Sequence, residues 1–458
     1  MNLTRYRELL RGRRTRRVLT GLGVSALGDG MSTVTIAWLA VRVAPGGRLG
    51  VFVGLAVAAY TLPGVIGTLT FARVLRRRPA RTLVLLHCLL RTAFLGMVAA
   101  LWGTGALSPP LYVLLLAGSS LLSAWGNAGQ YAMLSELGGA DGRLAINSLA
   151  TAQVSFAVIA GPLVAGLLIG RVGPGWLIAL DGASFAFLGI QAWRTPASGT
   201  ATEQPVDTQT AESGLRLLLR RRDLLSLTLL TWLFFFLYGP VEAALPVYVA
   251  GDLHADAGLL GAYWTAFGVG ALAATLLTGT LRARNVRRAA LLIVAGWGAC
   301  LLPFAFAPVG VTLACFALGG LVYGPYLPIT YAQYQSATTP ANLPAVLAAR
   351  SAIILVSTPL GTAIGGPLVG ALGATGTLAA SGGLTVALAV AARLLWAGED
   401  VRPMSQGPDM LPRHAGPTTC RRRAGRSGRR RPPPRRARAR SPARGRSRPG
   451  PGGPRPDR

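Results

Sequence analysis

The chain has 458 residues, of which 51% are hydrophobic and only 14% are charged, and its mean hydropathy is +0.46. Soluble globular proteins carry about 25% charged residues, so this composition excludes an ordinary soluble protein and indicates a polytopic membrane protein. The formal net charge of +30 comes from 46 basic residues, all of them arginine, a choice that reflects GC-rich coding more than chemistry.

Recognisable motifs of catalytic and metal sites do not occur in the sequence. It contains no Walker A phosphate loop, no HExxH, no GxSxG and no Cys/His cluster. The four cysteines, at positions 88, 300, 315 and 420, lack CxxC spacing, and three of them lie in apolar segments where buried free thiols are expected. We therefore predict neither an enzyme nor a metal or cofactor site.

Twelve apolar runs follow a basic N-terminal segment, residues 1–17. This segment is too long for a cleaved signal peptide and leads into a full-length span, so we expect an uncleaved first transmembrane helix. Runs of about 20 residues suffice to cross the hydrocarbon core of a bilayer. The spans are predicted at residues 18–42, 51–72, 82–103, 110–132, 147–170, 175–194, 224–250, 258–281, 288–308, 309–333, 345–371 and 373–396.

A hydrophilic stretch divides these spans into two groups of six. Residues 195–222 form the predicted cytoplasmic linker between an N-terminal six-helix half, 18–194, and a C-terminal half, 223–397. Loops on the side of the N-terminus hold 22 arginines, whereas the opposite loops hold three. Because arginine-rich loops stay in the cytoplasm, we predict a multi-pass protein of the cell membrane with both termini in the cytoplasm.

A short motif recurs at the same place in each half. Residues 161–166 read GPLVAG in the fifth span, and residues 366–370 read GPLVG in the eleventh. Such matches arise from two parallel six-helix repeats, so the predicted fold is all-α with two six-helix pseudo-repeats. Glycine lets helices pack closely and proline bends them, which predicts a role in packing and conformational change. The residues concerned are Gly161, Pro162, Gly166, Gly366, Pro367 and Gly370.

The first span contains a carboxylate, Asp29, between two glycines and about 11 residues from its start. At about 1.5 Å per residue this position is near the bilayer midplane. A charge there is costly unless it is paired, hydrated or protonated. The carboxylate is therefore either a proton or cation site facing a central cavity, or a structural acid held by a neighbouring helix.

Arg91 in the third span lies at a similar depth and is the predicted partner of Asp29, with His87 one turn earlier. The pair would act in proton coupling or as a permanent salt bridge.

In the seventh span Glu242 stands between Pro240 and Pro246, and broken spans expose polar groups to a cavity. Glu242 is thus a second candidate proton carrier, or else an acid that reaches water on the outer side.

Asp181 and a set of aromatic residues are weaker candidates for a functional site. Asp181 in the sixth span is predicted to serve packing more than transport. Aromatic side chains in the spans are candidates for the wall of a large cavity, although such residues more often pack between helices. They are Trp38, Tyr60, Trp125, Tyr131, Phe234, Tyr238, Tyr263, Trp264, Tyr323 and Tyr326.

The C-terminal tail, residues 398–458, differs in kind from the rest of the chain. It holds 18 arginines against four acidic residues and is rich in proline, so it is predicted to be disordered. Contact with anionic lipid at the cytoplasmic leaflet is one interpretation. The tail lacks the interleaved aromatics of single-strand binders, so we expect no specific nucleic acid. A frameshift in GC-rich DNA would produce the same composition and is the alternative.

Several strings, in their order and spacing over residues 10–396, resemble the major facilitator superfamily. They are LGDG at 27–30, GRLAINSLA at 142–150, GPLVAGLL at 161–168, DGASFAFL at 181–188 and SGLRLLLRRRDLL at 213–225. Specifically, they look like its drug and siderophore exporter branch, similar to enterobactin exporters. The resemblance implies alternating access between two six-helix halves.

The same resemblance implies a cytoplasmic gate loop between the second and third spans. That family carries GxLxDRxGRR there, but this chain has Ala72 where the acidic residue would fall. The basic residues Arg73, Arg76, Arg77 and Arg78 are kept. Loss of the carboxylate suggests a weaker latch, or one with other partners.

From these observations we expect a secondary active transporter that exports an amphiphilic small molecule, a drug, antibiotic or siderophore, in exchange for protons. We expect it to act as a monomer in the lipid bilayer. Two alternatives remain: an importer on the same fold, and a non-transporting membrane sensor or anchor that acts through its basic tail.

Overall fold

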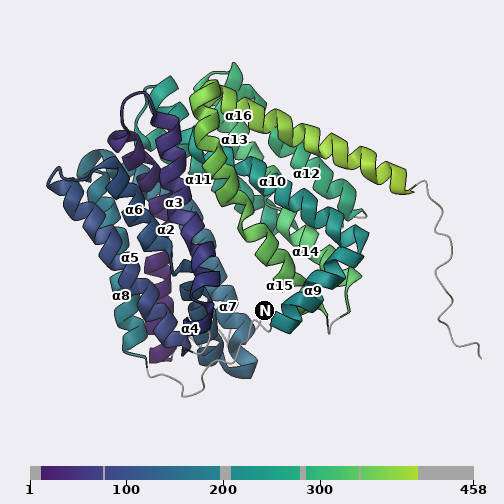
Figure 1. Cartoon of the computed structure of the whole chain (residues 1–458), viewed down its shortest axis with the longest axis horizontal. Coiled ribbons are helices and arrows are strands. Elements are labelled where there is room, and N and C mark those ends of the chain that lie inside the picture. Colours follow the sequence, from purple (N-terminus) through teal and green to yellow (C-terminus); the bar gives the residue numbers. More distant parts are fainter. Residues whose placement is uncertain (1–11, 76–77, 196–207, 279–284, 340–341, 401–458) are drawn as a thin grey trace, which may run out of the picture. The chain divides into compact units, whose positions relative to one another are not determined.

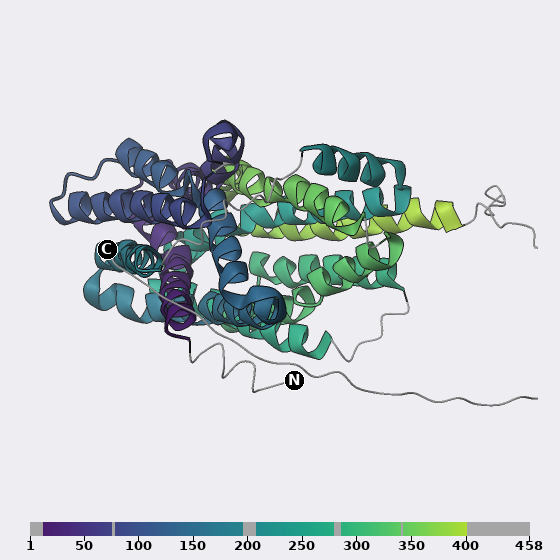
Figure 2. The ribbon, with the colours of Figure 1, turned by 90° about the horizontal axis from the view of Figure 1, so that it is seen from below.

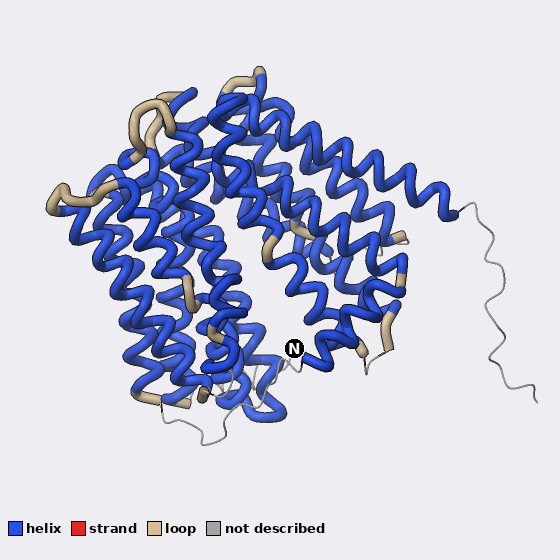
Figure 3. Tube along the Cα trace, in the orientation of Figure 1, coloured by secondary structure: helices blue, strands red, loops and turns tan. Residues whose placement is uncertain are grey.

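A computed structural model describes residues 12–75, 78–195, 208–278, 285–339 and 342–400, and every regular element among them is a helix (Figure 3). Apolar runs without charged residues favour helices, because a helix satisfies its own backbone hydrogen bonds inside the bilayer. The N-terminal half consists of α2 (Arg13–Val43), α3 (Leu49–Thr70), the short α4 (Ala72–Leu75), α5 (Ala80–Gly103), α6 (Pro109–Ser120), α7 (Ser123–Val172) and α8 (Pro174–Trp193).

The linker contributes α9 (Thr208–Arg220), which packs against α15 of the C-terminal half. That half consists of α10 (Arg222–Val247), a π turn (Tyr248–Asp252), α11 (Ala257–Thr278), α12 (Val286–Leu301), a 3₁₀ turn (Leu302–Ala305), α13 (Val309–Tyr323), α14 (Tyr326–Ala337), α15 (Leu343–Leu355) and α16 (Ser357–Asp400).

Eleven stretches of the described residues are long and apolar enough to span a membrane. The last of them, Ala345–Ala397, has 53 residues. At about 1.5 Å per residue a helix of that length would far exceed the ~30 Å hydrocarbon core. Gly373 interrupts it with a φ of 74°, a left-handed conformation that favours glycine, so it contains two crossings. The predicted fold class, twelve transmembrane helices in two six-helix groups, is confirmed.

The two groups of helices lie side by side in both views (Figures 1 and 2). Helices α3 and α7 of the N-terminal half pack against α16 and α11 of the C-terminal half, and α3 also contacts α10. By contrast, α5 and α8 pack against each other and against helices of their own half.

Two expectations about connecting segments differ from the structure. Residues 133–146 are predicted to form a loop between the fourth and fifth spans, but they are helical in the structure, and the chain turns back within this helical stretch between the spans Pro109–Gly138 and Ala145–Val172. Apart from glycines this stretch holds good helix formers such as leucine, glutamate and alanine, which explains the difference. The linker is also partly helical at residues 208–220. The N-terminal residues 1–11 and the tail residues 401–458 lie outside the described residues.

The aromatic residues of the C-terminal half mostly pack on one another. Tyr238 lies with its ring centroid 5.7 Å from that of Trp297, and Phe267 lies 5.3 Å from Trp297 and 5.4 Å from Tyr323. Edge-to-face and offset pairs at such distances are stabilising. These rings therefore form much of the core of this half, which favours packing between helices over the interpretation as cavity wall.

The two Gly-Pro motifs lie where helices of different halves meet. A Cβ atom on Gly54 of α3 would stand 2.6 Å from Cα of Gly366 in α16, and one on Gly261 of α11 would stand 2.5 Å from the carbonyl oxygen of Pro162 in α7. Real Cβ atoms essentially never come so close to backbone, so only glycine permits these crossings. Gly161 is equally close to Gly30 of α2, within the N-terminal half.

A larger residue at such a crossing is expected to stop transport without unfolding either half. In the variant Gly366→Leu the side chain would push α16 away from α3, so for the exporter that the sequence predicts we expect cellular substrate accumulation to return to the level without the protein. The matched control is Gly383→Leu in the same helix, where a Cβ atom meets nothing within 4 Å. Equal activity of both variants at equal expression would contradict this role of the motif.

Candidate functional site

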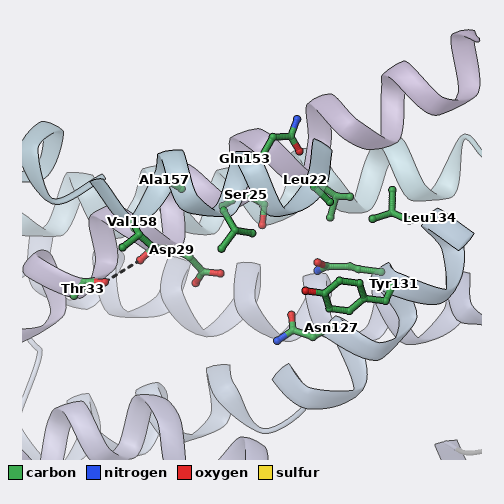
Figure 4. A pocket seen from close by; sticks show the side chains of 15 residues that line it. Leu22, Ser25, Asp29, Thr33, Asn127, Tyr131, Leu134, Gln153, Ala157 and Val158 are labelled. Atoms are coloured by element: carbon green, nitrogen blue, oxygen red, sulfur yellow. Dashed lines mark hydrogen bonds between the residues drawn. The ribbon is translucent and has the colours of Figure 1, made fainter. Parts of the chain in front are cut away.

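A cavity of about 380 Å³ opens within the N-terminal half, and Asp29 projects into it (Figure 4). Its walls come from one face of α2 and from two stretches of α7, residues 127–134 and 150–158. Both stretches border one cavity, so the chain folds back between them. The polar lining groups are Ser25, Asp29, Thr33, Asn127, Gln130, Tyr131 and Gln153.

Three side chains from three helices form a connected polar group at this cavity. Nη1 of Arg91 lies 3.3 Å from Oδ1 of Asp29 and also donates to the hydroxyl of Tyr60. That hydroxyl in turn donates to Oδ1 of Asp29 over 2.9 Å. The guanidinium carbon of Arg91 lies 4.4 Å from the ring centroid of Tyr60 and 5.0 Å from that of Phe185. The predicted contact between Asp29 and Arg91 is therefore present.

The two charges of this pair differ strongly in exposure. The side chain of Asp29 is 46% exposed, whereas that of Arg91 is 7% exposed. Charge pairs are screened less in the interior than in water, so the buried guanidinium holds Asp29 more strongly than a surface pair would. The carboxylate can nevertheless meet a solute in the cavity, because its free side faces the open space.

A second carboxylate, Asp181 of α8, lies deeper in the same half. It is fully buried, and Oγ of Ser32 donates to its Oδ2 over 2.5 Å. Oγ1 of Thr92 donates to the carbonyl of Gly182 over 3.0 Å, which holds α5 and α8 together next to both charges. The guanidinium of Arg91 also interacts electrostatically with the carboxylate of Asp181, but its salt bridge among the described residues is with Asp29.

The other candidate carboxylate, Glu242, lies in the C-terminal half, apart from the polar group around Asp29. Its Oε2 accepts a hydrogen bond of 2.9 Å from Oγ1 of Thr362 in α16, and the side chain is half-buried. Asp29 thus has an arginine partner, while the partner found for Glu242 is a neutral hydroxyl. The structure brings Asp29 and Arg91 together and leaves Glu242 in the other half.

The predicted gate loop is only partly described. Arg73 lies in the short α4, and both Arg73 and Arg78 are exposed. Arg76 and Arg77 lie outside the described residues.

Within the described part of the chain no group of three His, Cys, Asp or Glu residues could hold a metal ion, and Cys88, Cys300 and Cys315 are free thiols.

Sequence reasoning missed the role of Tyr60, which is predicted as cavity wall but whose hydroxyl bridges the charges of Asp29 and Arg91. Asp181, predicted to serve packing, accepts the hydrogen bond from Ser32 that joins α8 to α2, and its charge also interacts with that of Arg91. Ionisable groups inside a membrane find partners within the bundle, and this rule could have pointed to both residues.

Twelve apolar spans in two groups, with a carboxylate–arginine pair at a cavity among them, define an integral membrane protein with a transporter fold. Comparison with known proteins agrees. The model of the Major Facilitator Superfamily matches residues 18–249 and again residues 227–435. The chain belongs to this superfamily, whose members are small-molecule transporters of the membrane.

Relatives with curated names share less than a third of their residues with the chain. The uncharacterized MFS-type transporter y4rN of Sinorhizobium fredii is 29% identical over 336 residues, 69% of this chain and 82% of the relative. The multidrug efflux pump Tap of Mycobacterium tuberculosis is 28% identical over 377 residues, 78% of this chain and 87% of the relative.

Solved structures share the fold at low identity. The nucleoside transporter NupG aligns with a TM-score of 0.66 and 13% identity, over 84% of this chain and 99% of NupG. A D-xylose-proton symporter aligns with a TM-score of 0.62 and 13% identity, over 83% of this chain and 96% of the symporter. At such identity these structures show the fold alone.

Proposed function

We propose that this protein exports an amphiphilic small molecule from the cell by exchange for protons. The observation that carries the proposal is the Asp29 carboxylate, 46% exposed at a cavity and backed by a buried arginine 3.3 Å away. A carboxylate in this position can bind a proton from one side of the membrane and release it to the other. The similarity to the multidrug efflux pump Tap supports export as the direction.

The proposed cycle follows from the charges. When the cavity faces outward, a proton binds Asp29 and cancels its charge, which weakens its attraction to Arg91 and to a bound cationic group. When the cavity faces inward, Asp29 releases the proton and can accept the next substrate. Inward movement of one proton supplies about 2.3 kcal/mol per 100 mV of membrane potential.

The orientation and the division of the chain belong to the same proposal. Residues 18–194 and 223–397 would form the two halves that rock about the cavity, joined by the cytoplasmic linker 195–222. Both termini would lie in the cytoplasm, and the transporter would act as a monomer in the cell membrane. The drug and siderophore exporter branch, with a drug, antibiotic or siderophore as substrate, is the branch that the sequence motifs support.

The test is cellular accumulation of fluorescent cations, antibiotics and siderophores in a host without its own major exporters. We expect lower accumulation when the protein is expressed, and reversal by a protonophore because the gradient supplies the energy. Unchanged accumulation for every compound would contradict export.

An importer on the same fold is the second candidate, because a carboxylate–arginine pair at a cavity could couple protons to uptake as well as to export. Counterflow in right-side-out and inverted vesicles separates the two directions.

The third candidate is a sensor or anchor that acts through the tail 398–458, which would also contact anionic lipid. A transporter is expected to retain activity when residues 398–458 are deleted, whereas an anchor is not.

A further inference from the structure

A narrow apolar groove of about 270 Å³ lies between α5 and α8, apart from the cavity of the transport site. Leu85 and Leu89 line it from α5, and Gly189 and Ile190 line it from α8. Gly189 forms part of its floor, because a Cβ atom there would stand 3.2 Å from Cβ of Cys88. The groove is therefore an apolar slot between the two helices.

The groove faces away from the other half of the protein. Leu89 is 63% exposed and Trp193, at the end of the groove, is 65% exposed. Helices α5 and α8 lie at the outer edge of the N-terminal half, on the side opposite α10 and α16 (Figure 1). In an integral membrane protein, exposed apolar side chains on the outer face of a span contact lipid, so hydrocarbon chains surround this groove.

One end of the groove carries an arginine. Nη2 of Arg81, at the start of α5, donates to the carbonyl of Trp193 over 2.5 Å. Nε of the same guanidinium is buried and has no hydrogen-bond partner among the described residues, so the Nη groups are the donors that a phosphate at this end would meet. The hydrogen bond to the carbonyl of Trp193 fixes the guanidinium beside the mouth of the groove. Arginine groups bind phosphate oxygens through paired N–H donors.

We propose that this groove binds an anionic phospholipid of the surrounding membrane. One acyl chain lies in the slot between α5 and α8, and the headgroup phosphate accepts hydrogen bonds from Arg81. The apolar slot and the cation at its end match the two parts of such a lipid. The occupant is a single lipid, because the slot lies between two neighbouring helices and opens directly to the bilayer.

The experiment is native mass spectrometry of the full-length chain, purified in detergent, delipidated and titrated with phosphatidylglycerol or phosphatidylcholine. We expect one phosphatidylglycerol to be retained in preference to phosphatidylcholine. In the variant Arg81→Gln the preference is expected to fall about tenfold, since a charge-assisted hydrogen bond is worth about one factor of ten in affinity. The matched control, Arg194→Gln, removes an exposed arginine next to Trp193 and is expected to keep the preference.

A second variant tests the slot without touching the charge. Ala186 is a half-buried lining residue, and Ala186→Leu is expected to fill the groove and to lower the retention of phosphatidylglycerol although Arg81 is intact. Equal losses of the preference for phosphatidylglycerol in Arg81→Gln and Arg194→Gln would indicate a general attraction of the lipid to positive charge and would overturn the proposal. Unchanged retention in Ala186→Leu would overturn it as well. None of these readouts depends on transport, so the result is independent of the proposed function.

Discussion

The variant Asp29→Asn is expected to lose proton-coupled export completely while its fold is kept. The asparagine side chain has nearly the same shape, and its Oδ1 can still accept the 2.9 Å hydrogen bond from Tyr60. It cannot bind and release a proton at physiological pH, so the step that uses the gradient is lost. Cellular accumulation of a transported compound should rise to the level without transporter, with or without protonophore.

Two other acid-to-amide variants make the result specific. Glu242→Gln removes the other candidate carboxylate, and under the proposal it retains protonophore-sensitive export. Asp223→Asn removes a half-buried acid that pairs with the exposed Arg221 over 2.8 Å, a pair near the surface of little expected importance, and serves as the matched control. Full activity in Asp29→Asn, together with loss in Glu242→Gln, would transfer the proposed coupling site to the C-terminal half.

Much of the fold follows from patterns that are local in the sequence. A span needs only about 20 apolar residues, so hydropathy shows it without tertiary information. The midplane position of Asp29 is equally local, because α2 runs from Arg13 to Val43 and places the carboxylate near its centre. The contact with Arg91 follows from depth alone, since two opposite charges at the same level of a small bundle have few other partners.

The parts that sequence patterns did not reveal depend on how helices rotate against one another. Tyr60 and Asp181 are 31 and 149 residues from their partners Asp29 and Ser32 in the chain, and no spacing rule connects them. Whether an aromatic ring borders a cavity or packs on another ring depends on the same rotation. Tyr131 faces the cavity, while Tyr238 packs against Trp297.

The charge balance around Arg91 predicts a second large effect, this time on stability. Arg91 forms a salt bridge with Asp29, which reaches the cavity, and interacts at longer range with the fully buried Asp181. Replacing Arg91 with methionine keeps most of the volume but removes the positive charge near Asp181. A fully buried carboxylate without a compensating charge is destabilising, so we expect poor yield and a lowered melting temperature for Arg91→Met.

The two possible rescues of this variant separate the roles of the carboxylates. Adding Asp181→Asn removes the uncompensated buried charge, so the double variant is expected to regain most of the yield and melting temperature, measured in detergent. Adding Asp29→Asn is expected to rescue far less, because water in the cavity already solvates that carboxylate in the absence of Arg91. Equal rescue by both would mean that Asp29 and Asp181 depend on the arginine equally. No rescue by either would assign the stabilising effect of Arg91 to its packing against Tyr60 and Phe185.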